Sequence, residues 1–208
     1  DKIKSSALAA IEYTINSQHQ ERGGWRYSPG QDSDTSVTGW QLMALHSARM
    51  AGLELPEKPF DLARRWLDFA GGGEHGGLYG YQSPSDISRA MVATGMFCRQ
   101  LDMVPPSSPK MIESAELMKR YPIRDNNPDL YYIYYGTLAL YQHQGPIWQQ
   151  WNNNLKRILP DIQIKSGSLA GSWDLSRSNT KGGGRIASTT LAILSLEVYY
   201  RILPMYGF

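Results

Sequence analysis

Three loops of the sequence share a glycine–aromatic pattern: Gly23-Gly24-Trp25, Gly76-Gly77-Leu78-Tyr79 and Gly171-Ser172-Trp173. Each loop lies between two stretches with helical character, and equivalent points recur at a period of about 50 residues. A fourth pair of such stretches has Asn127-Pro128-Asp129 in the corresponding place. The pattern predicts four helical hairpins built from one repeated unit.

The apolar residues recur with the spacing of helices and not of strands. The odd-numbered members of the predicted helix series are amphipathic, whereas the even-numbered members are apolar on most sides and must be covered all round. We therefore predict an all-α fold of about four helix pairs, with an inner and an outer layer. The eight helices are expected at residues 1–19, 35–51, 59–70, 86–103, 109–120, 130–143, 146–159 and 186–203.

Length and composition set limits on the function. The 208 residues can form one domain with a substantial core, so we treat residues 1–208 as a single domain. A net charge of +2 with mixed signs argues against a nucleic-acid partner, and no apolar stretch reaches the roughly 20 residues of a membrane span. The single cysteine, Cys98, leaves the compartment open. We predict no metal and no other cofactor, because the four histidines are scattered.

Two of the hairpin joints carry a longer motif, in which a glutamine precedes the Gly-x-Trp of the loop. The first copy comprises Ala10, Tyr13, Gln18, Gly23 and Trp25, and the second Leu159, Gln163, Gly171 and Trp173. This motif resembles the repeat of squalene and terpene cyclases, and the other two hairpins match it weakly. We interpret the glutamine as tying the helix end to the loop and the tryptophan as packing over the joint.

The resemblance implies a fold and a ligand class. It implies a partial or complete α/α toroid, in which inner helices form a ring and outer helices surround it. Four pairs then make either an open arc or the C-terminal part of a longer chain, whose other parts would be partners. The residues 197–204 also resemble the ending of bacterial squalene-cyclase-like proteins. The implied ligand is an apolar isoprenoid.

The segment Asp-Ser-Asp-Thr at residues 32–35 allows two interpretations. It resembles the aspartate motif with which class II terpene cyclases protonate their substrate. That resemblance implies that Asp34 is the catalytic acid and Asp32 its partner, although Thr35 stands where many members have a third aspartate. The local sequence favours a simpler role, because Asp34 precedes an apolar helix and aspartate commonly caps helix N-termini.

Aromatic side chains are candidates for lining a ligand site. Trp40, Tyr131 and Tyr135 fall on predicted inner helices, and the two tyrosines share a helix face at i, i+4 spacing. Desolvated aromatic rings attract cations by ~1–2 kcal/mol each, but the same pattern is also typical of a plain core. Trp25 and Trp173 are further candidates because they sit in the loops.

The predicted layers place one set of helix ends together. Successive inner helices should run parallel, because one antiparallel outer helix separates each from the next. Their N-termini, where free N–H groups carry partial positive charge, then form one rim with Asp34, Asp86, Asp129 and Arg185. We expect Arg185 to pair with one of these aspartates. The main pocket should lie at this rim or in the concavity below it.

Three classes of function stay open at this point. The first is an isoprenoid-handling, cyclase-like domain, catalytically complete or incomplete. The second is a non-enzymatic binding or scaffold module that uses the concave surface. The third is a carbohydrate-active α/α enzyme, which would need two convergent carboxylates. The sequence does not decide whether the chain is an enzyme.

Overall fold

The computed structural model describes residues 2–124, 128–174, 183–202 and 205, and it confirms the predicted all-α class. One short antiparallel pair, β1 (Gly71–Gly72) and β2 (Leu78–Tyr79), interrupts the loop between the third and fourth helices. The helices are α1 (Lys2–Asn16), α2 (Thr35–Met50), α3 (Lys58–Ala70), α4 (Arg89–Leu101), α5 (Pro109–Arg120), α6 (Leu130–His143), α7 (Gly145–Ile162) and α8 (Gly184–Arg201).

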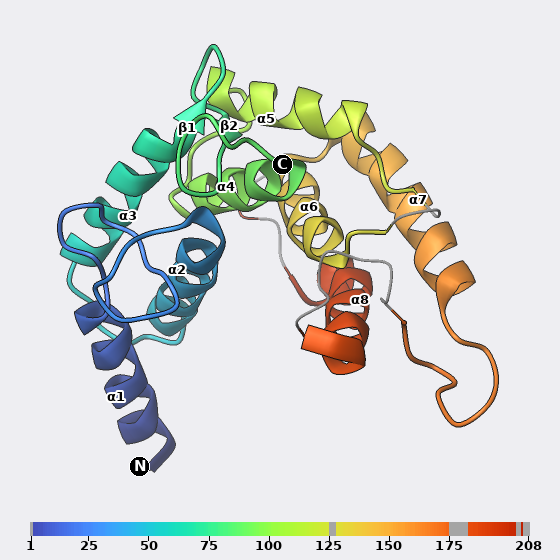
Figure 1. Cartoon of the computed structure of the whole chain (residues 1–208), viewed down its shortest axis with the longest axis horizontal. Helices are drawn as coiled ribbons and strands as arrows, with labels where there is room; N and C mark the ends of the chain where they lie inside the picture. Colours follow the sequence, from blue (N-terminus) through green and yellow to red (C-terminus); the bar gives the residue numbers. More distant parts are fainter. Residues whose placement is uncertain (1, 125–127, 175–182, 203–204, 206–208) are drawn as a thin grey trace.

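The helices form an arc of two layers (Figure 1). The even-numbered helices α2, α4, α6 and α8 pack one against the next on the inside of the arc. Each of the odd-numbered helices α3, α5 and α7 lies outside and packs against the inner helices. Helix α1 packs on α2 but buries none of its residues fully.

The joint between α1 and α2 is held by the motif residues themselves. The side-chain amide of Gln18 donates to the carbonyl of Gly23 at 2.8 Å. The indole N–H of Trp25 donates to the carbonyl of Thr14 at 2.7 Å, and its backbone N–H donates to the Thr38 hydroxyl at 3.1 Å. These bonds connect the end of α1, the loop and the first turn of α2.

The joint between α7 and α8 repeats these three bonds. Gln163 donates to the carbonyl of Gly171 at 2.9 Å, and the Trp173 indole donates to the carbonyl of Leu159 at 2.8 Å. The backbone N–H of Trp173 donates to the Thr189 hydroxyl at 3.2 Å. The interpretation of the glutamine as a tie and the tryptophan as a packed cover is thus confirmed in both copies.

Gly23 and Gly171 have the same backbone conformation in the two joints. Their φ angles are +91° and +85°, a left-handed region that glycine enters without steric penalty. A Cβ atom on Gly23 would also lie 2.0 Å from the carbonyl oxygen of Leu62. The joint therefore requires glycine at this position, which explains the glycine of the motif.

The hairpin of α3 and α4 uses a tyrosine where the other two joints use tryptophan. Tyr79 is fully buried, and its hydroxyl accepts a hydrogen bond from the guanidinium of Arg99 at 3.2 Å. Arg99 also donates to Asp68 of α3. The hairpin that matches the motif weakly is therefore held at the same place by a tyrosine and an arginine instead of a glutamine and a tryptophan.

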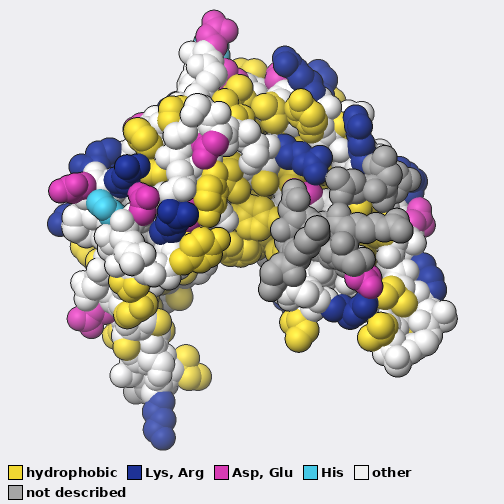
Figure 2. Space-filling model, in the orientation of Figure 1, with side chains coloured by type: hydrophobic (Ala, Val, Ile, Leu, Met, Phe, Trp, Pro, Cys, Tyr) yellow, Lys and Arg dark blue, Asp and Glu magenta, His cyan; other side chains and the backbone are white. Residues whose placement is uncertain are grey.

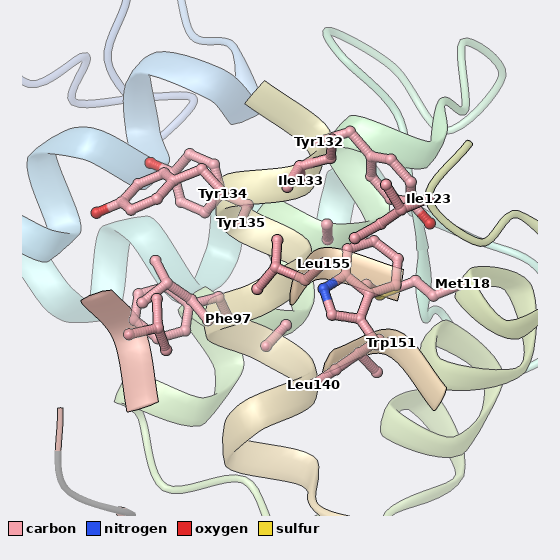
Figure 3. Packing of buried hydrophobic residues seen from close by; sticks show 14 of the residues in the cluster. Phe97, Met118, Ile123, Tyr132, Ile133, Tyr134, Tyr135, Leu140, Trp151 and Leu155 are labelled. Carbon is pink, nitrogen blue, oxygen red and sulfur yellow. The ribbon is translucent and has the colours of Figure 1, made fainter. Parts of the chain in front are cut away.

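The core fills the space between the two layers (Figure 3). Trp151 of outer helix α7 lies perpendicular to the ring of Tyr132 on α6, with 5.3 Å between the ring centroids. Its indole N–H donates to the Thr137 hydroxyl at 3.0 Å. A buried indole with a satisfied N–H combines a large apolar surface with a fixed orientation.

The inner helices α2 and α4 come unusually close at Gly39. A Cβ atom there would lie 2.4 Å from the Thr94 side chain and 3.2 Å from the Tyr135 hydroxyl. The absence of a side chain at Gly39 therefore allows α2 to approach both α4 and the tyrosines of α6. This approach brings the next residue, Trp40, beside those tyrosines.

Candidate functional site

The N-terminal ends of three inner helices, α2, α4 and α6, meet on one rim, as the layer argument predicts for them. The Ser36 hydroxyl at the start of α2 donates to the Tyr131 hydroxyl at the start of α6 at 2.8 Å. Arg89, the first residue of α4, lies 3.8 Å from the carboxylate of Asp129. Near the opposite ends, Gln100 of α4 donates to the carbonyl of Ala139 on α6. The inner helices α2, α4 and α6 therefore run parallel.

Asp34 caps α2. Its carboxylate accepts from the backbone N–H of Val37 at 2.7 Å and from the Tyr81 hydroxyl at 3.2 Å. The guanidinium of Arg26 lies 3.8 Å away. The side chain has no exposed surface, and this burial raises the pKa of Asp34, although Val37, Tyr81 and Arg26 act to lower it.

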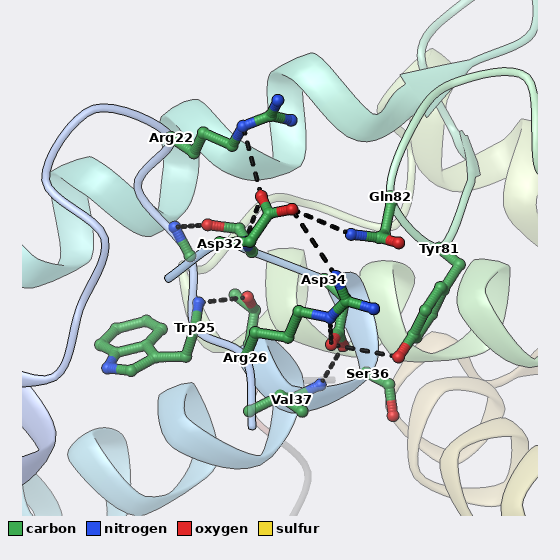
Figure 4. A network of polar contacts seen from close by, with 12 residues as sticks. Arg22, Trp25, Arg26, Asp32, Asp34, Ser36, Val37, Tyr81 and Gln82 are labelled. Carbon is green, nitrogen blue, oxygen red and sulfur yellow. Dashed lines mark hydrogen bonds and ion pairs between the residues drawn. The ribbon is translucent and has the colours of Figure 1, made fainter. Parts of the chain in front are cut away.

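Asp32 lies beside this cap in a network of charged and polar side chains (Figure 4). Its carboxylate is 3.3 Å from the guanidinium of Arg22 and 3.6 Å from that of Arg26. The side-chain amide of Gln82 donates to it at 3.2 Å. Two aspartates and two arginines therefore balance each other at the rim.

An aromatic cluster lies directly below, between α2 and α6. Trp40 stacks on Tyr134 with 5.7 Å between centroids and 14° between planes, and it meets Tyr131 and Tyr135 edge-on at 6.1 and 5.1 Å. Figure 3 shows Tyr134 and Tyr135 pointing from α6 toward α2. We call these four residues the Trp40 cluster. Trp40 is 37% exposed, whereas Tyr134 and Tyr135 are buried.

Tyr131 connects the Trp40 cluster to the rim. Its hydroxyl accepts from Ser36 at 2.8 Å and receives a longer contact from the Thr94 hydroxyl at 3.4 Å. Burial raises the pKa of Tyr131 to about 12 and also raises that of Tyr135. Both phenols are therefore neutral at pH 7, so the cluster carries no charge.

Five predicted site residues need correction. Tyr135 has no exposed surface, so it supports Trp40 from within the core and presents no ring face to a ligand. Trp25 and Trp173 are 2% and 3% exposed, so they hold the joints and present no ring face to a ligand. Asp86 does not cap α4. The Ser88 side chain accepts from the backbone N–H of Met91 there, while the Asp86 carboxylate closes a turn by accepting from the backbone N–H groups of Gln82 and Ser83.

Arg185 does not pair with an aspartate of the rim. It pairs with Asp174 at 2.9 Å, within the joint between α7 and α8.

Asp129 behaves as the cap that its sequence position suggested. Its carboxylate accepts from the backbone N–H of Tyr132 at 3.1 Å at the start of α6. It is buried and lies 3.8 Å from Arg89. Asp129 thus resembles Asp34 in its contacts, as a buried cap beside a guanidinium.

The predicted position of the main pocket is only partly correct. One hollow of about 410 Å³ lies at the rim and is lined by Arg26, Tyr27, Ser28, Gln31 and Asp32. Hollows of about 410 and 420 Å³ also flank outer helix α5. The rim hollow is therefore no larger than the two hollows beside α5.

Several residues of the site escaped prediction from the sequence. Arg26 and Gln82 reach Asp32 or Asp34 from loops, and Gln82 is 50 residues from Asp32 along the chain. Thr38 and Thr189 accept from the motif tryptophans one turn into the next helix. No sequence signal marked the threonines, because they follow their tryptophans at different distances, 13 and 16 residues.

Within the described part of the chain, no three His, Cys, Asp or Glu side chains lie together in a way that could hold a metal ion. Nor is any described helix long and apolar enough to cross a bilayer. A scan against models of protein families finds no match for this chain, and neither does a search of curated proteins.

Proposed function

We propose that this chain is a ligand-binding module, built as an arc of an α/α toroid, that holds an apolar isoprenoid-type molecule against the Trp40 cluster without protonating it. The observation that carries the proposal is the contrast between a side chain of α2 and the side chain that caps it. Trp40, on the concave side, is 37% exposed, whereas Asp34, the acid of the cyclase-like motif, has no exposed surface.

The environment of Asp34 supports a structural role. A catalytic acid has to lie within hydrogen-bond reach of the atom that it protonates. The carboxylate of Asp34 is instead engaged by Val37 and Tyr81, with Arg26 nearby, and it lines none of the hollows described above. A cap of this kind contributes about 1 kcal/mol to stability.

The Trp40 cluster supports apolar binding. Figure 2 shows hydrophobic side chains gathered on the inner side of the arc, in the hollow between α2 and α8. An apolar ligand that covers exposed indole surface gains about 25 cal/mol for each Å² removed from water. Tyr131, which is half-buried, adds an uncharged ring to the surface, and the buried Tyr134 and Tyr135 hold the indole of Trp40 in place.

Trp40 fluorescence offers a direct test. The other five tryptophans are at most 8% exposed, so collisional quenching by acrylamide should report mainly on Trp40. We expect farnesol to shift the emission to the blue and to protect it from acrylamide. The variant Trp40→Phe should lose both responses, and Tyr134→Ala should weaken binding, whereas Tyr200→Ala, on exposed α8 surface, should not. A response that survives in Trp40→Phe would contradict the proposal.

One observation favours a second candidate, a proton-initiated cyclase. Burial raises the pKa of Asp34, as a protonating acid requires, although the hydrogen bond from Tyr81 acts to lower it. The two candidates differ in whether a bound isoprenoid is converted, so product analysis separates them. The non-enzymatic scaffold alternative predicts that Trp40 responds to no small apolar molecule.

A further inference from the structure

The rim hollow is a second place on the molecule with the properties of a ligand site. It measures about 410 Å³ and is lined by five residues of the loop between α1 and α2. Small-molecule sites commonly have volumes of about 300–1,000 Å³. The lining combines one aromatic ring, one guanidinium, one carboxylate, one amide and one hydroxyl: Tyr27, Arg26, Asp32, Gln31 and Ser28.

Tyr27 provides a flat surface at this hollow. Tyr27 is 80% exposed, yet its hydroxyl is close enough to that of Tyr81 to help raise the pKa of Tyr81. Tyr81 in turn donates to the buried cap Asp34. The chain of hydroxyl contacts holds the exposed ring to a rigid part of the fold, so little side-chain freedom is lost when a ligand stacks on it.

The polar groups of the hollow are balanced in charge, and Arg26 has only long contacts. Arg26 lies 3.6 Å from Asp32 and 3.8 Å from Asp34, contacts that are ionic but too long for hydrogen bonds. Among the residues that the structure describes, the guanidinium of Arg26 makes no closer polar contact. Its N–H groups and the amide of Gln31 can therefore donate to a ligand. Asp32 already accepts from Ser33 at 2.8 Å and from Gln82 at 3.2 Å, so it can add one acceptor contact where it faces Arg26.

We propose that the rim hollow binds a neutral saccharide. Two arginines and two aspartates cancel at the rim, so a charged ligand gains little from the local field. A sugar offers adjacent hydroxyls that both donate and accept, matched to Arg26 and Asp32, and an apolar ring face for Tyr27. This site is distinct from the Trp40 cluster and does not depend on its ligand.

Backbone amide NMR of the full chain can test the proposal with maltose, cellobiose and lactose as probes, and with phosphate and citrate as charged comparators. We expect at least one disaccharide to shift the amides of residues 26–32 at millimolar concentration. Tyr27→Ala should weaken this binding by about tenfold, and Tyr27→Phe, which keeps the ring, by much less. Tyr200→Ala, at a similarly exposed tyrosine, should have no effect.

Three outcomes would overturn the saccharide proposal. They are the absence of shifts with every disaccharide, stronger shifts in the same loop with the anions, and equal binding by Tyr27→Ala and the wild type. The emission of Trp40 under the same titration separates this proposal from the apolar one. A saccharide at the rim should leave the Trp40 emission unchanged. If the saccharide proposal fails, the farnesol response still tests the apolar proposal separately.

Discussion

Trp25→Ala should lower the free energy of unfolding by about 3–5 kcal/mol, a large share of the 5–15 kcal/mol typical of a domain. The indole is 2% exposed and packs over the joint of α1 and α2. Its removal leaves a cavity and deprives the carbonyl of Thr14 of its donor. Urea unfolding followed by circular dichroism at the helical band measures the change.

Two control variants separate the joint from tryptophan content in general. Trp25→Phe keeps much of the volume but loses the indole N–H, so it should be less destabilising than the alanine variant. Trp40→Ala removes a partly exposed indole and should cost about 1 kcal/mol. If Trp25→Ala is no more destabilising than Trp40→Ala, the motif does not hold the hairpin.

His46 should make the fold acid-sensitive, by about 2–3 kcal/mol between pH 6.5 and pH 4. Burial, with smaller effects from Arg49 and Arg64, lowers the pKa of His46 to about 4 in the folded chain. The unfolded chain therefore binds a proton at this residue from about pH 6.5 downward, while the folded chain excludes it. The stabilising contribution of neutral His46 is complete above pH 6.5 and is lost as the pH falls to about 4.

The measurement is the free energy of unfolding as a function of pH for the wild type and for His46→Leu. The leucine variant cannot take up this proton, so its stability should fall less steeply over the same interval. The raised pKa of Asp102, which lies 3.9 Å from His46, acts in the opposite direction in both proteins. Parallel pH profiles of the two proteins would show that His46 is not the responsible group.

Most of the helices and two of the joints between them could be predicted from the sequence, because helical periodicity and local motifs determine them. The predicted and observed limits of the second and sixth helices agree closely, since Asp34 and Asp129 mark their starts. Both Gly-x-Trp joints followed from local residues in the same way. The fourth helix was predicted to begin at Asp86, but Ser88 is its cap and the helix begins at Arg89.

The candidate site was less readable, because its geometry depends on contacts between distant loops. Arg185 was expected to pair across the rim, but Asp174 lies within its own joint and is nearer. Whether Trp25 is buried and Trp40 exposed is determined by how α2 packs on its neighbours, which residue type alone does not specify. Tyr81 donates to Asp34 from the next hairpin, and no local sequence pattern predicts that contact.

The most direct test of the central claim is the chemical identity of an isoprenoid recovered after incubation with the protein. Squalene and farnesol would be incubated with the wild type and with Asp34→Asn, which keeps a side-chain oxygen to cap α2 but cannot supply an acid. Mass spectrometry of the extracted ligand should return unchanged isoprenoid in equal amounts from both proteins. A cyclised product from the wild type that Asp34→Asn does not form would contradict the account and make Asp34 a catalytic acid.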